Sequence, residues 1–164
     1  MRIIGIDPGS RLTGYGIIEI LGDRSRAVHY GVIAAGSGEF TERLGIIFNN
    51  IRELLAEYQP DEAAVESVFV SHNAASAIKL GQARGAAICA LIAAGVPVSE
   101  YSPRSVKQAI VGRGAADKAQ VQHMIRALLG LTKTPQEDAA DALAVALCHH
   151  HTQSTLSRMP GVPR

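Results

Sequence analysis

The chain opens with Ile3-Ile4-Gly5-Ile6-Asp7-Pro8-Gly9-Ser10, a stretch in which a short apolar strand ends in a carboxylate. These isoleucines are too hydrophobic for a sheet edge, so we predict a central strand. Pro8-Gly9 signals a turn, and residues 13–20 predict a second strand that returns beside the first. Asp7 then lies at the rim of a sheet, where a buried carboxylate is costly unless a cation or hydrogen-bond donors meet it. On this stretch alone, Asp7 could equally well be a turn residue that only caps the hairpin.

Size and composition limit the class of protein. With 164 residues, 47% of them hydrophobic, the chain suits one domain, which we place at residues 1–151, with a flexible tail over residues 152–164. We expect no membrane association and a cytoplasmic location, because there is neither an apolar run of membrane-spanning length nor a signal-peptide pattern. Cys89 and Cys148 lack metal-type spacing and are predicted to be small core residues.

The remaining hydrophobic patterns predict three more strands and five helices. The strands are expected at residues 27–34, 62–67 and 96–101, and the helices at residues 41–58, 74–94, 103–111, 117–129 and 134–150. Short connections make the first three strands an antiparallel meander, and helical crossovers lead to the last two. We therefore predict an α/β fold with a mixed five-stranded sheet and helices on both faces.

Three further carboxylates occur in settings like that of Asp7. Glu66 closes the short strand 62–67, and Asp138 and Asp141 lie three residues apart on one face of the last helix. The small apolar residues around the latter two indicate that this helix lies close against the sheet. Four converging carboxylates would repel one another unless Mg²⁺ or Mn²⁺ neutralised them, and no cysteine or histidine cluster suits zinc. The alternative for Asp138 and Asp141 is simple placement in the N-terminal half of a helix, where the dipole favours anions.

The balance of charge is compatible with a polyanionic partner. The formal net charge is only +1, from 16 basic and 15 acidic residues. If four acids belong to a metal site, 16 basic residues face 11 remaining acids. This excess permits nucleic-acid binding without requiring it.

Five stretches of the chain carry a family resemblance. They are Gly5–Gly9, Glu66–Phe69, Leu80–Gly85, Val106–Gln108 and Asp138–Ala144. In order and spacing they resemble the signatures of RuvC, the bacterial Holliday (crossover) junction endodeoxyribonuclease family, over about residues 1–150. The first motif alone also opens sugar kinases and actin-like ATPases, but those proteins need a second lobe for which this chain is too short.

The resemblance implies a ribonuclease H-like fold and maps the catalytic acids onto Asp7, Glu66, Asp138 and Asp141. These residues are implied to hold two Mg²⁺ ions per subunit, replaceable by Mn²⁺, for in-line phosphodiester hydrolysis. The implied substrate is four-way junction DNA, nicked symmetrically to leave 5′-phosphate and 3′-hydroxyl ends in recombination and repair. Because two cuts need two active sites, we expect a C₂ homodimer. The branch-migration proteins RuvA and RuvB are implied partners.

Substrate contacts are predicted from basic and aromatic residues. Lys107 and Lys118 match family lysines near the active site and are candidates to neutralise a phosphate or transition-state charge. Phe69, just after Glu66, could stack on an unpaired base or anchor its loop on the core. Three arginines are candidate phosphate contacts, or else solvated surface charges: Arg84, Arg104 and Arg113.

Two further segments have more than one interpretation. The small residues of helix 74–94 suit close packing, either on a second copy of the chain or on its own sheet. His149, His150 and His151 are expected at the end of the last helix, where cations complement the dipole; metal binding is the weaker interpretation.

The sequence is also compatible with two other functional classes. The first is a different nuclease on the same fold, such as an enzyme that cuts RNA in hybrids or a YqgF-type protein. The second is a junction-binding module without catalysis.

Overall fold

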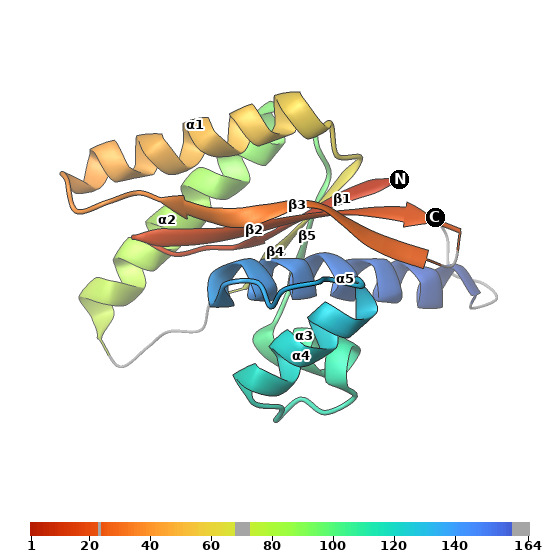
Figure 1. The fold of residues 1–164 in the computed structure, drawn as a ribbon. Helices are drawn as coiled ribbons and strands as arrows, with labels where there is room; N and C mark the ends of the chain where they lie inside the picture. Colours follow the sequence, from red (N-terminus) through yellow and green to blue (C-terminus); the bar gives the residue numbers. More distant parts are fainter. Residues whose placement is uncertain (23, 68–72, 159–164) are drawn as a thin grey trace.

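A computed structural model gives the fold of residues 1–22, 24–67 and 73–158. Its elements follow in the order β1 (Arg2–Asp7), β2 (Leu12–Leu21), β3 (Arg24–Ala34), α1 (Phe40–Tyr58), β4 (Glu62–Glu66), α2 (Ala74–Ala93), β5 (Val98–Tyr101), α3 (Pro103–Val111), α4 (Lys118–Leu128) and α5 (Glu137–Arg158) (Figure 1). The predicted order of strands and helices is confirmed.

The strands form one mixed sheet in the order β3-β2-β1-β4-β5. β1 and β2, like β2 and β3, pair antiparallel, whereas β4 lies parallel to both β1 and β5. β1 is therefore central, as its isoleucines predict. Because Ile6 pairs with Val65, the next residues, Asp7 and Glu66, leave neighbouring strands at the same edge of the sheet.

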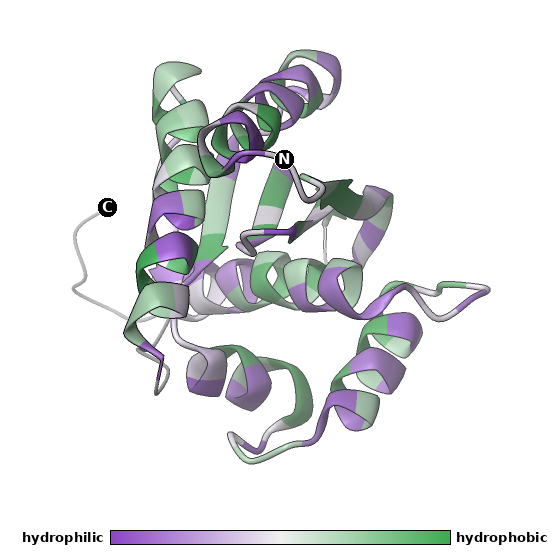
Figure 2. Ribbon diagram, turned by 90° about the vertical axis from the view of Figure 1, so that its left-hand side faces the viewer, coloured by the Kyte–Doolittle hydropathy of each residue, from purple (hydrophilic) through white to green (hydrophobic). Residues whose placement is uncertain are grey.

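Helices cover both faces of the sheet, with α1 and α2 on one side and α5, backed by α3 and α4, on the other (Figure 1). Viewed along the layers, the hydrophobic strands lie between these two helical coverings (Figure 2). Ile6 packs in the core under α1 and α2, whereas Ile3 and Ala64 pack in the core under α5. Since successive side chains of a strand alternate between faces, Asp7 and Glu66 both project toward α5.

Glycines let α5 lie unusually close to β1 and β2. A Cβ added at Gly5 would lie 2.0 Å from the carbonyl oxygen of Ala142, and one at Gly14 would lie 2.0 Å from that of Asp138. A Cβ added at Gly16, which pairs with Gly5 across the strands, would lie 2.7 Å from Cγ and 2.8 Å from the backbone nitrogen of Leu143. Real Cβ atoms essentially never come within 3.0 Å of such neighbours, so these three positions must lack a side chain for α5 to reach the sheet.

The end of α5 corrects two predictions. The helix begins at Glu137 and continues to Arg158, well past the predicted end at residue 150, so residues 152–158 of the expected flexible tail are helical. Residues 159–164 lie outside the described part of the chain. The extension is supported by side chains that bond back to the preceding turn, such as the Thr152 hydroxyl, which donates to the Cys148 carbonyl at 2.8 Å.

The histidine run consequently lies inside α5 rather than at its terminus, so the explanation by the helix dipole is wrong. His149 is 2% exposed and hydrogen-bonds through Nδ1 to the Tyr101 hydroxyl at 2.8 Å and through Nε2 to Glu62 at 2.7 Å. It joins α5 to β4 and β5, a structural role.

The cysteine prediction is half right. Cys148 is buried in α5, but Cys89 is exposed on α2, because that helix is apolar around its circumference and buries only one side. Among the described helices, none is long and apolar enough to cross a membrane.

Candidate active site

The carboxyl ends of β1 and β4 open into a pocket of about 290 Å³ beneath the start of α5. It is lined by Asp7, Glu66, Pro103, Val106, Lys107, Lys118, Val121 and Asp141. Three of the four predicted acids and both predicted lysines thus meet in one place, although β1, β4, α3, α4 and α5 each supply a part.

Asp138 does not line this pocket. It lies one turn before Asp141, and its backbone carbonyl packs on Gly14. Its charge still acts on the site, because it raises the pKa of both Asp7 and Asp141. Asp138 therefore belongs to the same acidic cluster at its outer side.

The pKa of Asp7 is raised from 3.8 to about 8. Burial is the largest cause, followed by the charges of Glu66, Asp141 and Asp138, and Lys118 opposes them only in part. A carboxyl group whose pKa is raised to near neutral pH is typical of functional sites.

Its neighbours shift in the same direction. Burial and the charge of Asp141 raise the pKa of Glu66 to about 7, against the opposing effects of Lys107, a hydrogen bond with Asp7, and Lys118. Burial likewise raises the pKa of Asp141, although both lysines oppose it. The two lysines therefore offset only part of the burial and mutual repulsion that raise these pKa values.

A hard divalent cation fits the chemistry of these donors. Carboxylate oxygens are the ligands that Mg²⁺ and Mn²⁺ prefer, and a cation would relieve both the repulsion and the cost of burial. Within the described residues, no three His, Cys, Asp or Glu side chains are already arranged as a metal-ligand set, and Asp7 and Glu66 hydrogen-bond to each other instead. The fit thus rests on donor chemistry and electrostatics.

Comparison with known proteins identifies the family to which this site belongs. The model of the family "Crossover junction endodeoxyribonuclease RuvC" matches residues 3–149. The chain belongs to the RuvC family. It is accordingly a nuclease of DNA recombination and repair, and its α/β fold is the one seen in that family.

Individual RuvC relatives match along nearly the whole chain. The RuvC protein of Alkalilimnicola ehrlichii is 55% identical over 158 residues, 96% of each chain, and that of Saccharophagus degradans is 55% identical over 160 residues, 97% of this chain and 92% of the relative. The structure of Thermus thermophilus RuvC in complex with a Holliday junction substrate superposes with a TM-score of 0.89 at 38% identity, covering 94% of this chain and 96% of that one. The yeast mitochondrial Holliday junction resolvase, at 12% identity and a TM-score of 0.67, shares the fold.

The other predicted substrate contacts of this RuvC-family chain lie in different surroundings. Arg104 and Arg113 are exposed, on α3 and in the loop after it. Arg84 is instead engaged inside the chain, with the Glu66 carbonyl and the Glu100 carboxylate. Phe69 lies outside the described residues.

Sequence patterns missed three groups that support the site. Glu137, at the start of α5, forms an ion pair with Lys118 that raises the pKa of the lysine. Arg43, buried on α1, donates through Nη2 to the carbonyl of Ser10 and so holds the turn after Asp7. The glycines under α5 are the third group, and their alternate spacing on paired strands was the available signal.

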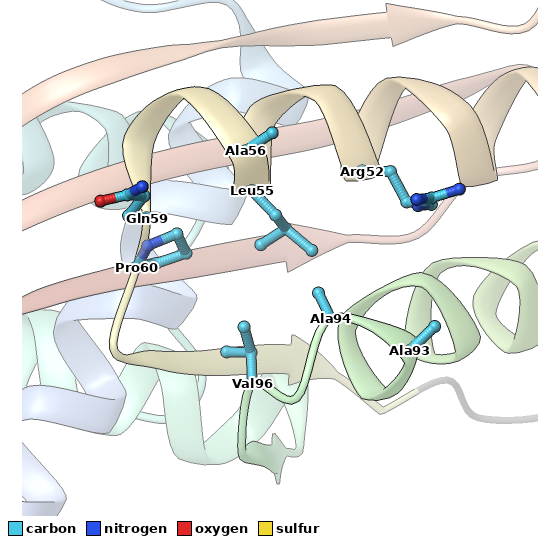
Figure 3. A pocket seen from close by; sticks show the side chains of 8 residues that line it. All are labelled: Arg52, Leu55, Ala56, Gln59, Pro60, Ala93, Ala94 and Val96. Carbon is cyan, nitrogen blue, oxygen red and sulfur yellow. The ribbon is translucent and has the colours of Figure 1, made fainter.

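A second hollow, of about 390 Å³, lies between the C-terminal ends of α1 and α2 (Figure 3). Most of its lining residues are of apolar type, among them Leu55, Pro60 and Val96, and Arg52 is the one charged residue among the described residues around it. Since it offers no carboxylate, it is not suited to phosphodiester hydrolysis.

Proposed function

We propose that this chain resolves four-way DNA junctions by paired, symmetric nicks, through metal-assisted hydrolysis in the pocket of Asp7, Glu66 and Asp141. The observation that carries the proposal is the convergence of these acids, from two strands and one helix, in a buried site where the pKa values of Asp7 and Glu66 rise to about 8 and about 7. A binding module without catalysis has no use for such a costly arrangement.

The acids would hold the metal ions, two per subunit. Asp7, Glu66 and Asp141 are the ligands we assign, with Asp138 at the outer side of the cluster. When bound, Mg²⁺ or Mn²⁺ would supply Lewis-acid stabilisation and an activated water, leaving a 5′-phosphate and a 3′-hydroxyl. Lys107 and Lys118, which line the same pocket, would offset charge on the attacked phosphate. Arg104, exposed on α3, and Arg113, exposed in the loop after α3, would contact phosphates that flank the cut.

Two nicks of like polarity need two active sites, and α2 offers a surface for a homodimer. Ile78, Gly81, Gly85, Cys89 and Ile92 follow one another at helical spacing along it. The two isoleucines are each 63% exposed, and a Cβ at either glycine would meet nothing within 4 Å inside the chain. Because packing within the chain does not require those glycines, close approach of a second α2 accounts for them better.

The cellular setting follows from the family. We propose that the dimer acts in the cytoplasm on junctions that RuvA and RuvB present. Binding of RuvA to the junction-bound chain, measured by mobility shift, would support that partnership.

The test is cleavage of a synthetic mobile four-way junction in Mg²⁺, with the polarity of the nicks recorded. We expect paired nicks in strands of like polarity, and no nicks from Asp7→Asn despite retained junction binding. Preferential cutting of an RNA–DNA hybrid would favour another nuclease class on this fold. Equal binding with no nicking by either protein would leave only a junction-binding module.

A further inference from the structure

Arg84 links three elements at the edge of the active site. From α2, its Nε donates to the backbone carbonyl of Glu66 at 3.4 Å, and its Nη2 forms an ion pair with Glu100 of β5. The arginine side chain is 22% exposed and that of Glu100 is 54% exposed. One guanidinium therefore contacts the last residue of β4 and also its neighbouring strand.

The same residue of β4 is fixed from its other side. Ser67 donates its backbone N–H to the carbonyl of Tyr101 at 2.8 Å and its hydroxyl to the same oxygen at 3.1 Å. Glu66 is thus held by Arg84 at its own carbonyl and by Ser67 through the next peptide. Both contacts act on the backbone, so they set where the Glu66 side chain starts without touching its carboxyl group.

The charge of Arg84 is already compensated within the chain. A DNA phosphate would have to displace Glu100 from the guanidinium before it could use the same donors. Arg104 and Arg113, by contrast, are exposed and remain available to a phosphate. The contacts of Arg84 therefore differ from those of a phosphate-binding arginine.

We propose that Arg84, with Glu100 as its partner, is a positioning residue that holds Glu66 in place for metal binding and cleavage. This inference rests on the proposed function of the acidic pocket. It also gives α2 a direct connection to the active site, because the helix that presents the dimer surface carries the guanidinium that holds Glu66.

The test compares R84M, E100Q and the double variant with the unaltered protein. R26M is the matched control, because Arg26 forms an ion pair with Glu19 between β2 and β3, beside the first residues of β1 rather than Asp7. Three quantities are measured: junction affinity and its salt dependence in chelator, the single-turnover cleavage rate at saturating protein, and Mn²⁺ affinity by calorimetry. Glu100 is more than half exposed, so E100Q is expected to fold even if R84M is impaired.

A positioning role predicts that R84M cleaves about 10- to 100-fold more slowly, because small misplacements of catalytic groups cost about this much. Its Mn²⁺ affinity falls, while its junction affinity and the salt dependence of binding stay within about twofold of those of the unaltered protein. A twofold change in affinity corresponds to less than about 0.5 kcal/mol of binding free energy, since 1.4 kcal/mol corresponds to a tenfold change. E100Q shifts in the same direction, the double variant is no worse than R84M, and R26M is unchanged.

Two results would overturn the inference. In the first, R84M loses about tenfold or more in junction affinity, the slope of log affinity against log salt concentration drops by about 1, and E100Q binds the junction more tightly. Arg84 then contacts a DNA phosphate. If R84M matches the unaltered protein in cleavage and Mn²⁺ affinity, it positions nothing. If the unaltered chain does not cleave junctions, the proposed function is wrong. The positioning role is tested separately by metal binding: equal Mn²⁺ affinities of R84M and the unaltered protein would overturn it.

Discussion

Changing Asp7 to Asn should stabilise the metal-free protein, although it should abolish cleavage. The pKa of Asp7 rises from 3.8 to about 8 on folding, so its ionised form is disfavoured in the native state. With about 1.4 kcal/mol per pKa unit, the ionised form of Asp7 destabilises the native state by at most about 6 kcal/mol. Because Asp7 is half-buried and can relax toward solvent, we expect a gain of about 2 kcal/mol for the asparagine.

The sign of the pH dependence follows from proton linkage. Between pH 4 and pH 8 the native state holds a proton on Asp7 that the unfolded chain has lost, so the unaltered protein loses stability as the pH rises. Asparagine does not titrate. The difference between the two proteins should therefore be small near pH 4, grow toward pH 8 and level off above it.

Thermal unfolding in chelator at pH 4.5, 6, 7 and 8.5 measures this difference. For a chain of 164 residues, 2 kcal/mol corresponds to a rise in Tm of roughly 4 to 8 °C. Adding Mg²⁺ should stabilise the unaltered protein more than the variant, whereas Glu53→Gln, exposed on α1, should have little effect at any pH. If Asp7→Asn is neutral or destabilising at every pH, burial and the neighbouring carboxylates do not disfavour ionised Asp7 in the folded protein.

Three further variants test the parts around this pocket. Gly5→Ala should destabilise the protein by about 1–3 kcal/mol in urea unfolding, because the added Cβ would meet the Ala142 carbonyl. The control Gly45→Ala, on α1, should instead stabilise it by about 0.5–1 kcal/mol. Equal effects of the two substitutions would contradict the close approach of α5 to the sheet. Lys118→Met should slow cleavage by about 10²–10³-fold, whereas Lys133→Met, at another exposed lysine, should not. An unchanged rate in Lys118→Met would exclude Lys118 from the chemistry. Gly85→Leu should give monomers in sedimentation while Gly45→Leu leaves the dimer intact; dimers from both would move the interface away from α2.

Much of this site could be predicted because its signals are local in the sequence. The alternation of Ile3, Ile4 and Ile6 indicates a central strand, and it also fixes the face on which Asp7 lies. The three-residue spacing of Asp138 and Asp141 predicts a shared helix face, which the structure qualifies, since Asp141 lines the pocket and Asp138 does not.

Other features depend on contacts between distant residues, which no local pattern records. Arg84, a candidate phosphate contact, forms an ion pair with Glu100, a partner that no local pattern indicates. The end of α5 was predicted too early because the polar residues after His151 resemble a tail, yet their hydroxyls bond to the helix backbone. Cys89 was predicted to be buried because α2 has no polar face to mark its exposed side.

We propose that residues of β1, β4 and α5 form one binding site for divalent metal. Anomalous diffraction from crystals of the unaltered chain soaked in Mn²⁺ tests it most directly. We expect strong peaks among the carboxylates of Asp7, Glu66 and Asp141, and their loss in Asp7→Asn crystals. Peaks confined to other parts of the surface, or no peak at millimolar Mn²⁺, would contradict it.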